Sequence, residues 1–102
     1  MDESAMPQGM NKLIHEPARL AIMTQLYVVD SADFIFVMQR TGLTWGNLSS
    51  HLSKLEAAGY VEVEKTFVDK KPHTLLKLSG AGRTAFEAYR KQLENLLNSL
   101  PQ

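Results

Sequence analysis

The spacing of hydrophobic positions along the chain changes several times, and each change marks the boundary between two predicted elements. Hydrophobic residues three and four positions apart are typical of a helix with one buried face, whereas alternation of hydrophobic and polar residues is typical of a half-buried strand. The predicted order is a helix at about 16–29, a short helix at about 32–41, a helix at about 44–58, a strand at 60–68, a turn at 69–72, a strand at 74–78 and a helix at about 79–100.

Residues with strong positional preferences support several of these boundaries. Pro17 suits the first turn of a helix, because its missing N–H has no partner there. Thr44 and Ser79 are suited to cap helix N-termini, and Gly59 is suited to end the helix that precedes it. The run at 34–38 has strand propensity, but the Thr-Gly pair that follows is suited to ending a helix and favours the short helix.

The length of the chain allows one domain. The polar residues 1–11 show no hydrophobic period and are predicted to form a flexible N-terminus. Residues 12–102 are predicted to fold as one domain, because a chain of 102 residues has room for one hydrophobic core. The predicted fold class is mainly α with a small β-hairpin, in the order α-α-α-β-β-α.

Composition excludes several classes of protein. The chain has no cysteine, which excludes disulfide scaffolds, cysteine-ligated zinc and thiol nucleophiles. No hydrophobic stretch approaches the ~18 residues that a membrane span needs, and no signal peptide is evident, so we expect a cytoplasmic protein without a membrane partner. No nucleophile lies near a base, and no glycine-rich phosphate loop is present, so we expect no enzymatic activity.

The charge balance taken alone argues against a nucleic-acid partner. Eleven lysines and arginines meet eleven aspartates and glutamates, for a formal net charge of zero, whereas nucleic-acid-binding domains are usually basic. The sum hides a segregation, because residues 65–77 hold four lysines and one aspartate, while residues 2–33 hold five acids and two bases. We therefore expect a positive edge at the hairpin and weak non-specific binding of DNA by each monomer.

The short helix, a turn at 42–44 and the following amphipathic helix form a predicted helix-turn-helix. In this motif the second helix enters the major groove of DNA, where its N-terminal residues contact base edges. Leu48, Leu52 and Leu55 form the predicted core face of this helix, and the opposite face carries small polar residues with no acid before Glu56. Such side chains suit a helix that reads base edges. The candidate DNA contacts of this helix are Thr44, Gly46, Asn47, Ser49, Ser50, His51 and Lys54.

The run TWGNLSSHLSKLEAAGYV, from Thr44 to Val61, resembles the recognition helix and following strand of winged helix-turn-helix transcriptional regulators. It is most similar to the small stand-alone prokaryotic members related to the MarR and ArsR groups, and its Ser-x-His-Leu element is similar to the ArsR pattern. The resemblance covers roughly residues 13–97, and it includes a Lys-Lys-Pro wing tip and the Gly82-Arg83 pair that opens the last helix.

The resemblance implies a homodimer that binds double-stranded DNA and regulates transcription. It also implies that the two recognition helices occupy successive major grooves, while the hairpin wings reach phosphates or the minor groove. Metal sensing is not implied, because the chain has no cysteine and its three histidines are scattered, and we expect no cofactor. Arg19 and Arg40 are either contacts to the DNA backbone or surface salt-bridge residues. The candidate DNA contacts of the wing are Lys65, Lys70, Lys71 and His73.

The last helix carries a hydrophobic stripe at steps of three and four residues, which is typical of a helix that pairs with another helix. In a domain of this size the stripe favours contact between two chains over packing on the first helix, and the helix is predicted to be a dimerisation helix. The candidate dimer contacts are Phe86, Tyr89, Leu93, Leu96, Leu97 and Leu100.

Two alternative functions remain open on the sequence. A winged-helix module that binds another protein would be expected to expose hydrophobic or acidic residues at Asn47, Ser50 and Lys54. A regulator that responds to an unknown small-molecule effector would need a pocket at the dimer interface, with Tyr27, Ile35 and Phe36 as its candidate lining. The bulky Trp45 either packs beneath the start of the recognition helix or protrudes toward the DNA.

Overall fold

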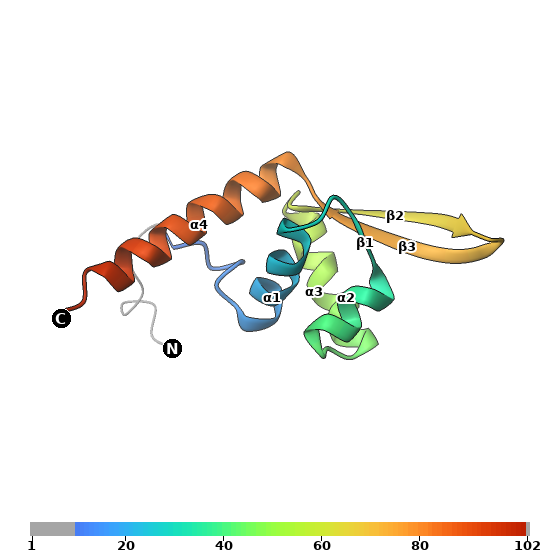
Figure 1. The fold of residues 1–102 in the computed structure, drawn as a ribbon, viewed down its shortest axis with the longest axis horizontal. Coiled ribbons are helices and arrows are strands. Elements are labelled where there is room, and N and C mark those ends of the chain that lie inside the picture. The colour runs from blue at the N-terminus through green and yellow to red at the C-terminus, as the bar shows by residue number, and fades with distance from the viewer. Residues whose placement is uncertain (1–9, 102) are drawn as a thin grey trace.

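The computed structural model describes residues 10–101 and contains every predicted element, with one strand in addition. Figure 1 shows the three shorter helices gathered beside the start of a long C-terminal helix, with a β-hairpin that extends in the direction opposite to the end of that helix. The elements are α1 (Pro17–Tyr27), β1 (Ala32–Asp33), α2 (Phe34–Thr41), α3 (Trp45–Ala57), β2 (Val61–Val68), β3 (Lys71–Leu78) and α4 (Gly80–Asn98).

The helices begin where their capping residues predict. Thr44 caps α3 by accepting a hydrogen bond from the backbone amide of Asn47 at 3.2 Å, and Ser79 caps α4 by accepting one from Gly82 at 2.9 Å. Pro17 occupies the first position of α1, as expected of a residue with no N–H to donate. The predicted bounds of these helices are therefore confirmed to within about two residues.

The additional strand, β1, is too short to show alternation. Ala32 pairs with Leu76 and Asp33 pairs with Leu75, which places β1 against β3 in a three-stranded antiparallel sheet of order β1-β3-β2. The sequence pattern assigns these two residues to the short helix, whereas α2 begins at Phe34. The predicted hairpin is thus confirmed, but it belongs to a sheet with a third strand that the sequence did not predict. The fold class, mainly α with a small sheet, is also confirmed.

The hairpin is longer than its sequence pattern indicates. β2 and β3 pair along their whole length, up to Val68 opposite Lys71, so β3 begins three residues before its predicted start. The turn consists of Asp69 and Lys70 alone rather than residues 69–72. Both have positive φ angles, 51° and 66°, as a two-residue turn of type I′ requires.

The hydrophobic core lies between α1, α2, α3, the first half of α4 and one face of the sheet. The three leucines predicted to form the core face of α3 are buried, and Val61 and Leu78 cover them from the sheet. The fully buried large side chains are Ile14, Ile22, Met23, Leu26, Val37, Leu48, Leu55, Leu76 and Tyr89.

The segment before α1 is anchored to this core. Of the residues predicted to be flexible, 1–9 lie outside the described part of the chain, but Met10 is buried and Asn11 donates a hydrogen bond to the Tyr60 hydroxyl at 3.0 Å. The side-chain oxygen of Asn11 also accepts from two backbone amides that follow it. The ordered domain therefore begins earlier than predicted, because one buried side chain and one polar side chain attach the segment to it.

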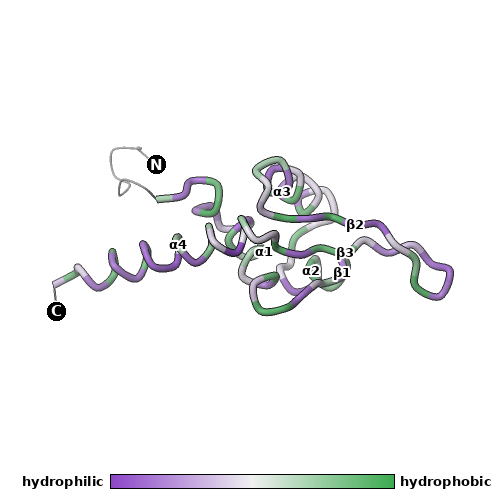
Figure 2. The backbone as a smooth tube through the Cα atoms, turned by 90° about the horizontal axis from the view of Figure 1, so that it is seen from above, coloured by the Kyte–Doolittle hydropathy of each residue, from purple (hydrophilic) through white to green (hydrophobic). Residues whose placement is uncertain are grey.

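The whole molecule is elongated and measures 56 × 26 × 24 Å along its principal axes. The C-terminal helix extends away from the other helices. Figure 2 shows α4 leaving the domain, with hydrophobic positions recurring along a mainly hydrophilic helix. In the described part of the chain, no helix combines the length and hydropathy required to cross a membrane.

Candidate nucleic-acid interface

The helix-turn-helix predicted from sequence is present. α2 ends at Gly42, whose left-handed backbone (φ 72°) lets its amide donate to the carbonyl of Met38 at 3.0 Å. Two residues later Thr44 caps α3, so the chain reverses within three residues. This tight turn leaves the N-terminal half of α3 with one face on the core and one face in solvent.

The solvent face of α3 is polar and narrow. Asn47, Ser50 and Lys54 are exposed along it, and Thr44 and Gly46 are exposed at its start. Nothing lies within 4 Å of where a Cβ on Gly46 would project, so the surface beside this glycine is open. Amide, hydroxyl and ammonium groups on an unobstructed helix face are the side chains that hydrogen-bond base edges and phosphates.

An open groove of about 400 Å³ separates α3 from the hairpin. Ser49 and Ser53 line its helix side, while Lys65 and Thr74 line its strand side. Hydroxyl and ammonium donors therefore face one another across a channel beside the solvent face of α3, and such donors suit a phosphodiester strand, although the Glu56 carboxylate also lines this groove.

Trp45 stands at the N-terminal end of this groove. Its ring packs against that of Phe34 of α2, tilted by 48° with the ring centroids 4.4 Å apart, yet 60% of the Trp45 surface is exposed. Part of the Trp45 side chain therefore packs on the domain while the rest protrudes, and its contact with DNA stays a prediction. The contact with Phe34 has no signal in the spacing of hydrophobic residues, because it joins the starts of two different helices.

The positive charge of the hairpin is concentrated at its tip. Lys77 forms an ion pair with Glu62 of the neighbouring strand at 3.5 Å, which removes it from the basic surface predicted over residues 65–77. In the part of the chain that the structure describes, Lys65, Lys70 and Lys71 form no ion pair, and all three are exposed. The three lysines of the wing that are predicted to contact DNA are thus accessible. They lie closer to the turn of the hairpin than Lys77 does.

His51 lies at the flank of α3, where it contacts α1. Its Nδ1 atom lies 3.2 Å from the Arg19 guanidinium and 3.7 Å from the Glu16 carboxylate. Arginine only donates, so Nδ1 acts as the acceptor in this contact. The Arg19 side chain is only 12% exposed and also donates to the carbonyl of Leu13, so it is a structural residue rather than a free surface cation.

Glu16 completes this cluster as the N-terminal cap of α1. Burial raises the pKa of its carboxyl, but hydrogen bonds from the backbone amides of Arg19 and Ala18 outweigh burial, and the pKa lies below its ordinary value. The ionised cap orients Arg19 toward His51. The cluster therefore holds the middle of the recognition helix against α1, a role that the sequence analysis did not identify.

His73, a predicted wing contact, is paired within the domain. Its Nδ1 atom donates to Asp33 Oδ2 at 2.6 Å, and Asp33 also accepts from the Ile35 amide as the N-terminal cap of α2. The hydrogen bond from His73 lowers the pKa of the Asp33 carboxyl and outweighs its partial burial. His73 lies opposite Thr66, in the third residue pair from the turn, and its bond to Asp33 connects β3 to the first helix of the helix-turn-helix.

The depressed pKa of Asp33 predicts a pH-dependent stability. A carboxyl whose pKa is lower in the folded chain than the ordinary value of 3.8 stabilises the fold above that value and loses this contribution as the pH falls through the folded pKa. Asp33→Asn, which keeps the capping oxygen, is expected to unfold about 1 kcal/mol more easily at neutral pH. Melting curves should show this difference shrinking as the pH falls below 3.8 and through the lower pKa of the folded chain.

Asp30→Asn is the matched control, because Asp30 is exposed and carries no such pair. It should melt like the wild-type protein throughout. A difference between Asp33→Asn and the wild-type protein that stays constant as the pH falls well below 3.8 would mean that charge does not contribute to the pair.

The predicted dimer stripe of α4 divides into two parts. Phe86 and Tyr89 are buried in the single chain at 8% and 2% exposure, and Leu93 is half-buried against the same core. These three pack within the chain, which corrects the prediction that the whole stripe serves a second chain. Beyond the core the stripe continues with exposed side chains: Leu96 (40%), Leu97 (56%) and Leu100 (61%).

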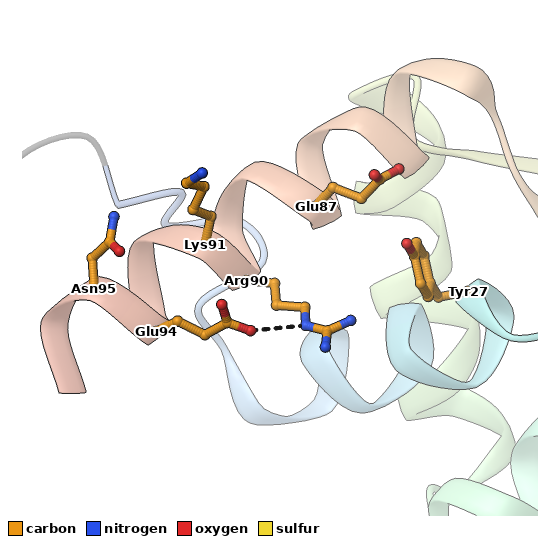
Figure 3. Close-up of a pocket in the computed structure, with 6 residues that line it drawn as sticks. All are labelled: Tyr27, Glu87, Arg90, Lys91, Glu94 and Asn95. Atoms are coloured by element: carbon orange, nitrogen blue, oxygen red, sulfur yellow. Dashed lines mark hydrogen bonds and ion pairs between the residues drawn. The ribbon is translucent and has the colours of Figure 1, made fainter. Parts of the chain in front are cut away.

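Tyr27, a candidate for an effector pocket, lines an open groove beside α4 (Figure 3). The other side chains of this groove are charged or polar, and Arg90 and Glu94 pair along α4 at 3.1 Å. Ile35 and Phe36 lie elsewhere, exposed on α2, where the Arg40 guanidinium sits 5.8 Å from the Phe36 ring centre. The three residues predicted to line one pocket are therefore not brought together within a single chain.

The three histidines lie in three separate contacts. His15 bonds the Tyr89 hydroxyl at 2.7 Å, and the other two contact α1 and Asp33 as described. Among residues 10–101, no three histidine, aspartate or glutamate side chains gather closely enough to hold a metal ion.

Comparisons with known proteins identify a family and several proteins of the same fold. The family described as winged helix DNA-binding domain matches residues 18–97. An uncharacterized protein of Methanocaldococcus jannaschii is 32% identical over 89 residues, which span 87% of this chain and 97% of that protein.

Solved structures extend the comparison. A transcriptional regulator homologue from Pyrococcus horikoshii superposes with a TM-score of 0.85 at 28% identity, over 90% of this chain and 91% of that one. A MarR mutant from E. coli, solved with operator DNA, has the same fold with a TM-score of 0.62 at 17% identity, over 78% of this chain and 67% of that one. Regulators of the MarR and ArsR families are among the structures that share the fold, as the recognition-helix motif predicts.

Proposed function

The chain belongs to the winged helix DNA-binding domain family, and on this premise we propose that it is a sequence-specific regulator of transcription that binds duplex DNA as a homodimer. Its family and fold are those of transcriptional regulators and not of enzymes. We place its action in the cytoplasm, where the DNA of a prokaryote lies.

The solvent face of α3 carries this proposal. Asn47, Ser50 and Lys54 are exposed together on one side of a helix whose other side is fixed to the core by three leucines. A protein-binding module would be expected to show hydrophobic or acidic residues there, and this face has neither before Glu56. We assign α3 to the major groove, with the half-buried Ser49 and His51 at the edges of the contact.

The wing supplies the second part of the interface. Lys65 lies in the groove beside α3, and Lys70 and Lys71 lie at the end of the hairpin, so we assign all three to phosphates that flank the major-groove site. We assign the exposed end of the α4 stripe to the second chain. Two-fold symmetry would then place the half-sites about 10 bp apart, or a multiple of that spacing.

Equilibrium titrations with two DNA probes test the proposal. One probe is a mixed-sequence duplex, and the other is a set of duplexes selected by the wild-type protein from a random-sequence library. We expect tighter binding to the selected set, and a fall in affinity with salt whose logarithmic slope is about −0.9 for each neutralised phosphate. The double variant Asn47→Ala, Ser50→Ala should bind the selected set at least ~10-fold more weakly, because contacts to base edges are lost.

Lys91→Ala is the control, since Lys91 is exposed on α4 and lies away from α3 and the wing. It should match the wild-type protein on both probes. Binding that does not respond to salt, or a double variant that still prefers the selected duplexes to the full extent, would overturn the assignment of α3 as the reading helix.

A further inference from the structure

The end of the hairpin carries exposed hydrophobic side chains that the core does not use. Phe67 is 74% exposed and Val68 is 48% exposed, and Pro72 is exposed opposite them. The alternation of β2 predicts that Phe67 belongs to a half-buried face, yet the core ends before this part of the strand. Figure 2 shows this hydrophobic stretch of β2 next to a hydrophilic turn, far from the helices.

The local backbone holds Phe67 in a defined position. Val68 pairs with Lys71 at the end of the two-residue turn, and Phe67 pairs with Pro72 one step further along. Hydrogen-bonded and non-hydrogen-bonded pairs alternate in an antiparallel ribbon. The pair beside the closing pair is therefore the non-hydrogen-bonded one, where side chains lie closest and the missing N–H of proline costs nothing. Pro72 and Phe67 are thus placed opposite one another on one face of the ribbon.

That face is the one turned toward the recognition helix. Side chains alternate along a strand, so Phe67 shares the face of Lys65 and Val63, both of which line the groove beside α3. The opposite face carries Glu62 and Glu64 toward the base of the hairpin, and Val68 and Lys71 beside the turn. A duplex bound to α3 would therefore meet the face with the aromatic ring and the lysine, while the acidic face points away.

The charges around Phe67 fit a polyanion. Lys65, Lys70 and Lys71 surround the hydrophobic tip, with Asp69 as the one acid between them, and none of the three lysines is paired within residues 10–101. A hydrophobic side chain ringed by cations on a protruding ribbon is the pattern of proteins that insert a wedge into the minor groove.

The length of the ribbon matches the geometry of DNA. A strand rises about 3.3 Å per residue, so Phe67 lies roughly 20 Å along β2 from Val61, which is buried beside the end of α3. A minor groove lies half a helical turn from the centre of an occupied major groove, or about 17 Å. The hairpin is therefore long enough for the ring to span that distance while α3 lies in the major groove.

We propose that Phe67 inserts between two base pairs from the minor groove, unstacking that step and bending the duplex, while the three lysines contact the flanking phosphates. This inference rests on the proposed function, because it requires α3 to occupy the adjacent major groove. It adds a mode of recognition, since a step that unstacks easily, such as TA or CA, becomes preferred without any hydrogen bond to its bases.

The test uses the full chain and the duplexes that the wild-type protein selects from a random library. Adenines at successive steps beside the recognition footprint are replaced by 2-aminopurine, whose fluorescence rises on unstacking, and dyes at the two duplex ends report bending. Wild-type protein should raise the fluorescence at one step several-fold and shorten the distance between the ends. Phe67→Ala should abolish both signals and weaken binding about 10-fold, and Phe67→Leu should retain them, because leucine also serves as a wedge.

Lys71→Ala is the matched variant at the same tip. It should reduce the salt slope by about 0.9 and keep the fluorescence signal, whereas Phe67→Ala should keep the slope and lose the signal. Phe67 is exposed, so its replacement leaves the fold intact.

The outcomes separate this inference from the proposed function. Salt-dependent binding of wild-type protein without any fluorescence change overturns the wedge and leaves the proposed function standing. Failure of the wild-type protein to bind duplex DNA overturns both. A change in the sedimentation of the free protein on Phe67→Ala would identify the tip as a contact between protein chains, which also overturns the wedge.

Discussion

Gly82→Ala is expected to lower the free energy of unfolding by about 3 kcal/mol, the upper part of the range for an overpacked site. A Cβ at this buried position would lie 2.0 Å from the carbonyl oxygen of Tyr60 and under 3 Å from two more backbone atoms of the same residue. Backbone cannot move aside like the end of a side chain, so α4 would have to shift away from the start of β2. Urea denaturation followed by circular dichroism measures the loss.

Gly80→Ala provides the control within the same helical turn. Nothing lies within 4 Å of a Cβ at Gly80, so alanine there should be neutral or slightly stabilising. Equal stability of the two variants would show that the approach of α4 to Tyr60 is not a constraint on this fold. The comparison isolates packing from helix propensity, because both substitutions are glycine to alanine near one helix end.

Leu97→Glu is expected to convert the proposed dimer into a folded monomer. Leu97 is 56% exposed, at the part of the α4 stripe that the core does not cover. A carboxylate facing its two-fold copy would have to be desolvated next to a hydrophobic surface. Loss of the second half-site should weaken binding to selected duplexes by about 100- to 10,000-fold, the gain that linking two binding sites provides.

Sedimentation velocity and DNA titration together measure this effect, and circular dichroism confirms that the variant is folded. Asn95→Glu adds the same charge one half-turn away from the stripe, on the side of α4 that faces the polar groove, and it should remain dimeric with full affinity. The assignment of the stripe fails if wild-type protein and both variants all sediment as monomers.

The elements that the sequence predicts well are those with long hydrophobic periods and recognisable caps. α3 has three buried leucines at helical spacing, a threonine cap and a stopping glycine, and its predicted bounds differ from the observed ones by one residue at each end. The helix-turn-helix and the resemblance to winged-helix regulators follow from this segment. Each of these signals is local, so each is visible without any knowledge of the tertiary structure.

The errors arise where contacts between distant residues decide the outcome. β1 is a strand only because Ala32 and Asp33 meet β3, more than forty positions away. The stripe of α4 has one uniform period, yet its first half packs inside the chain and its second half does not, because the domain ends beside Leu93. Periodicity identifies a hydrophobic face but does not specify which partner covers it.

The candidate site follows the same division. Asn47, Ser50 and Lys54 are exposed as their positions on an amphipathic helix predict. His51 and His73 have the right residue type for a DNA contact, but each is bonded to a carboxylate or arginine of another element.

The amino-acid sequence by itself determined the family, the helix-turn-helix and the polar face of α3, because these depend on residue types at short, regular spacings. It also determined that basic residues gather in the hairpin. Only the tertiary structure decided which of them are paired, because Lys77 meets Glu62 across the strands while Lys65, Lys70 and Lys71 form no ion pair with any other residue of 10–101. The fold likewise leaves Phe67 exposed beyond the core, since the pairing of β2 with β3 carries the hairpin past the helices that would have buried it.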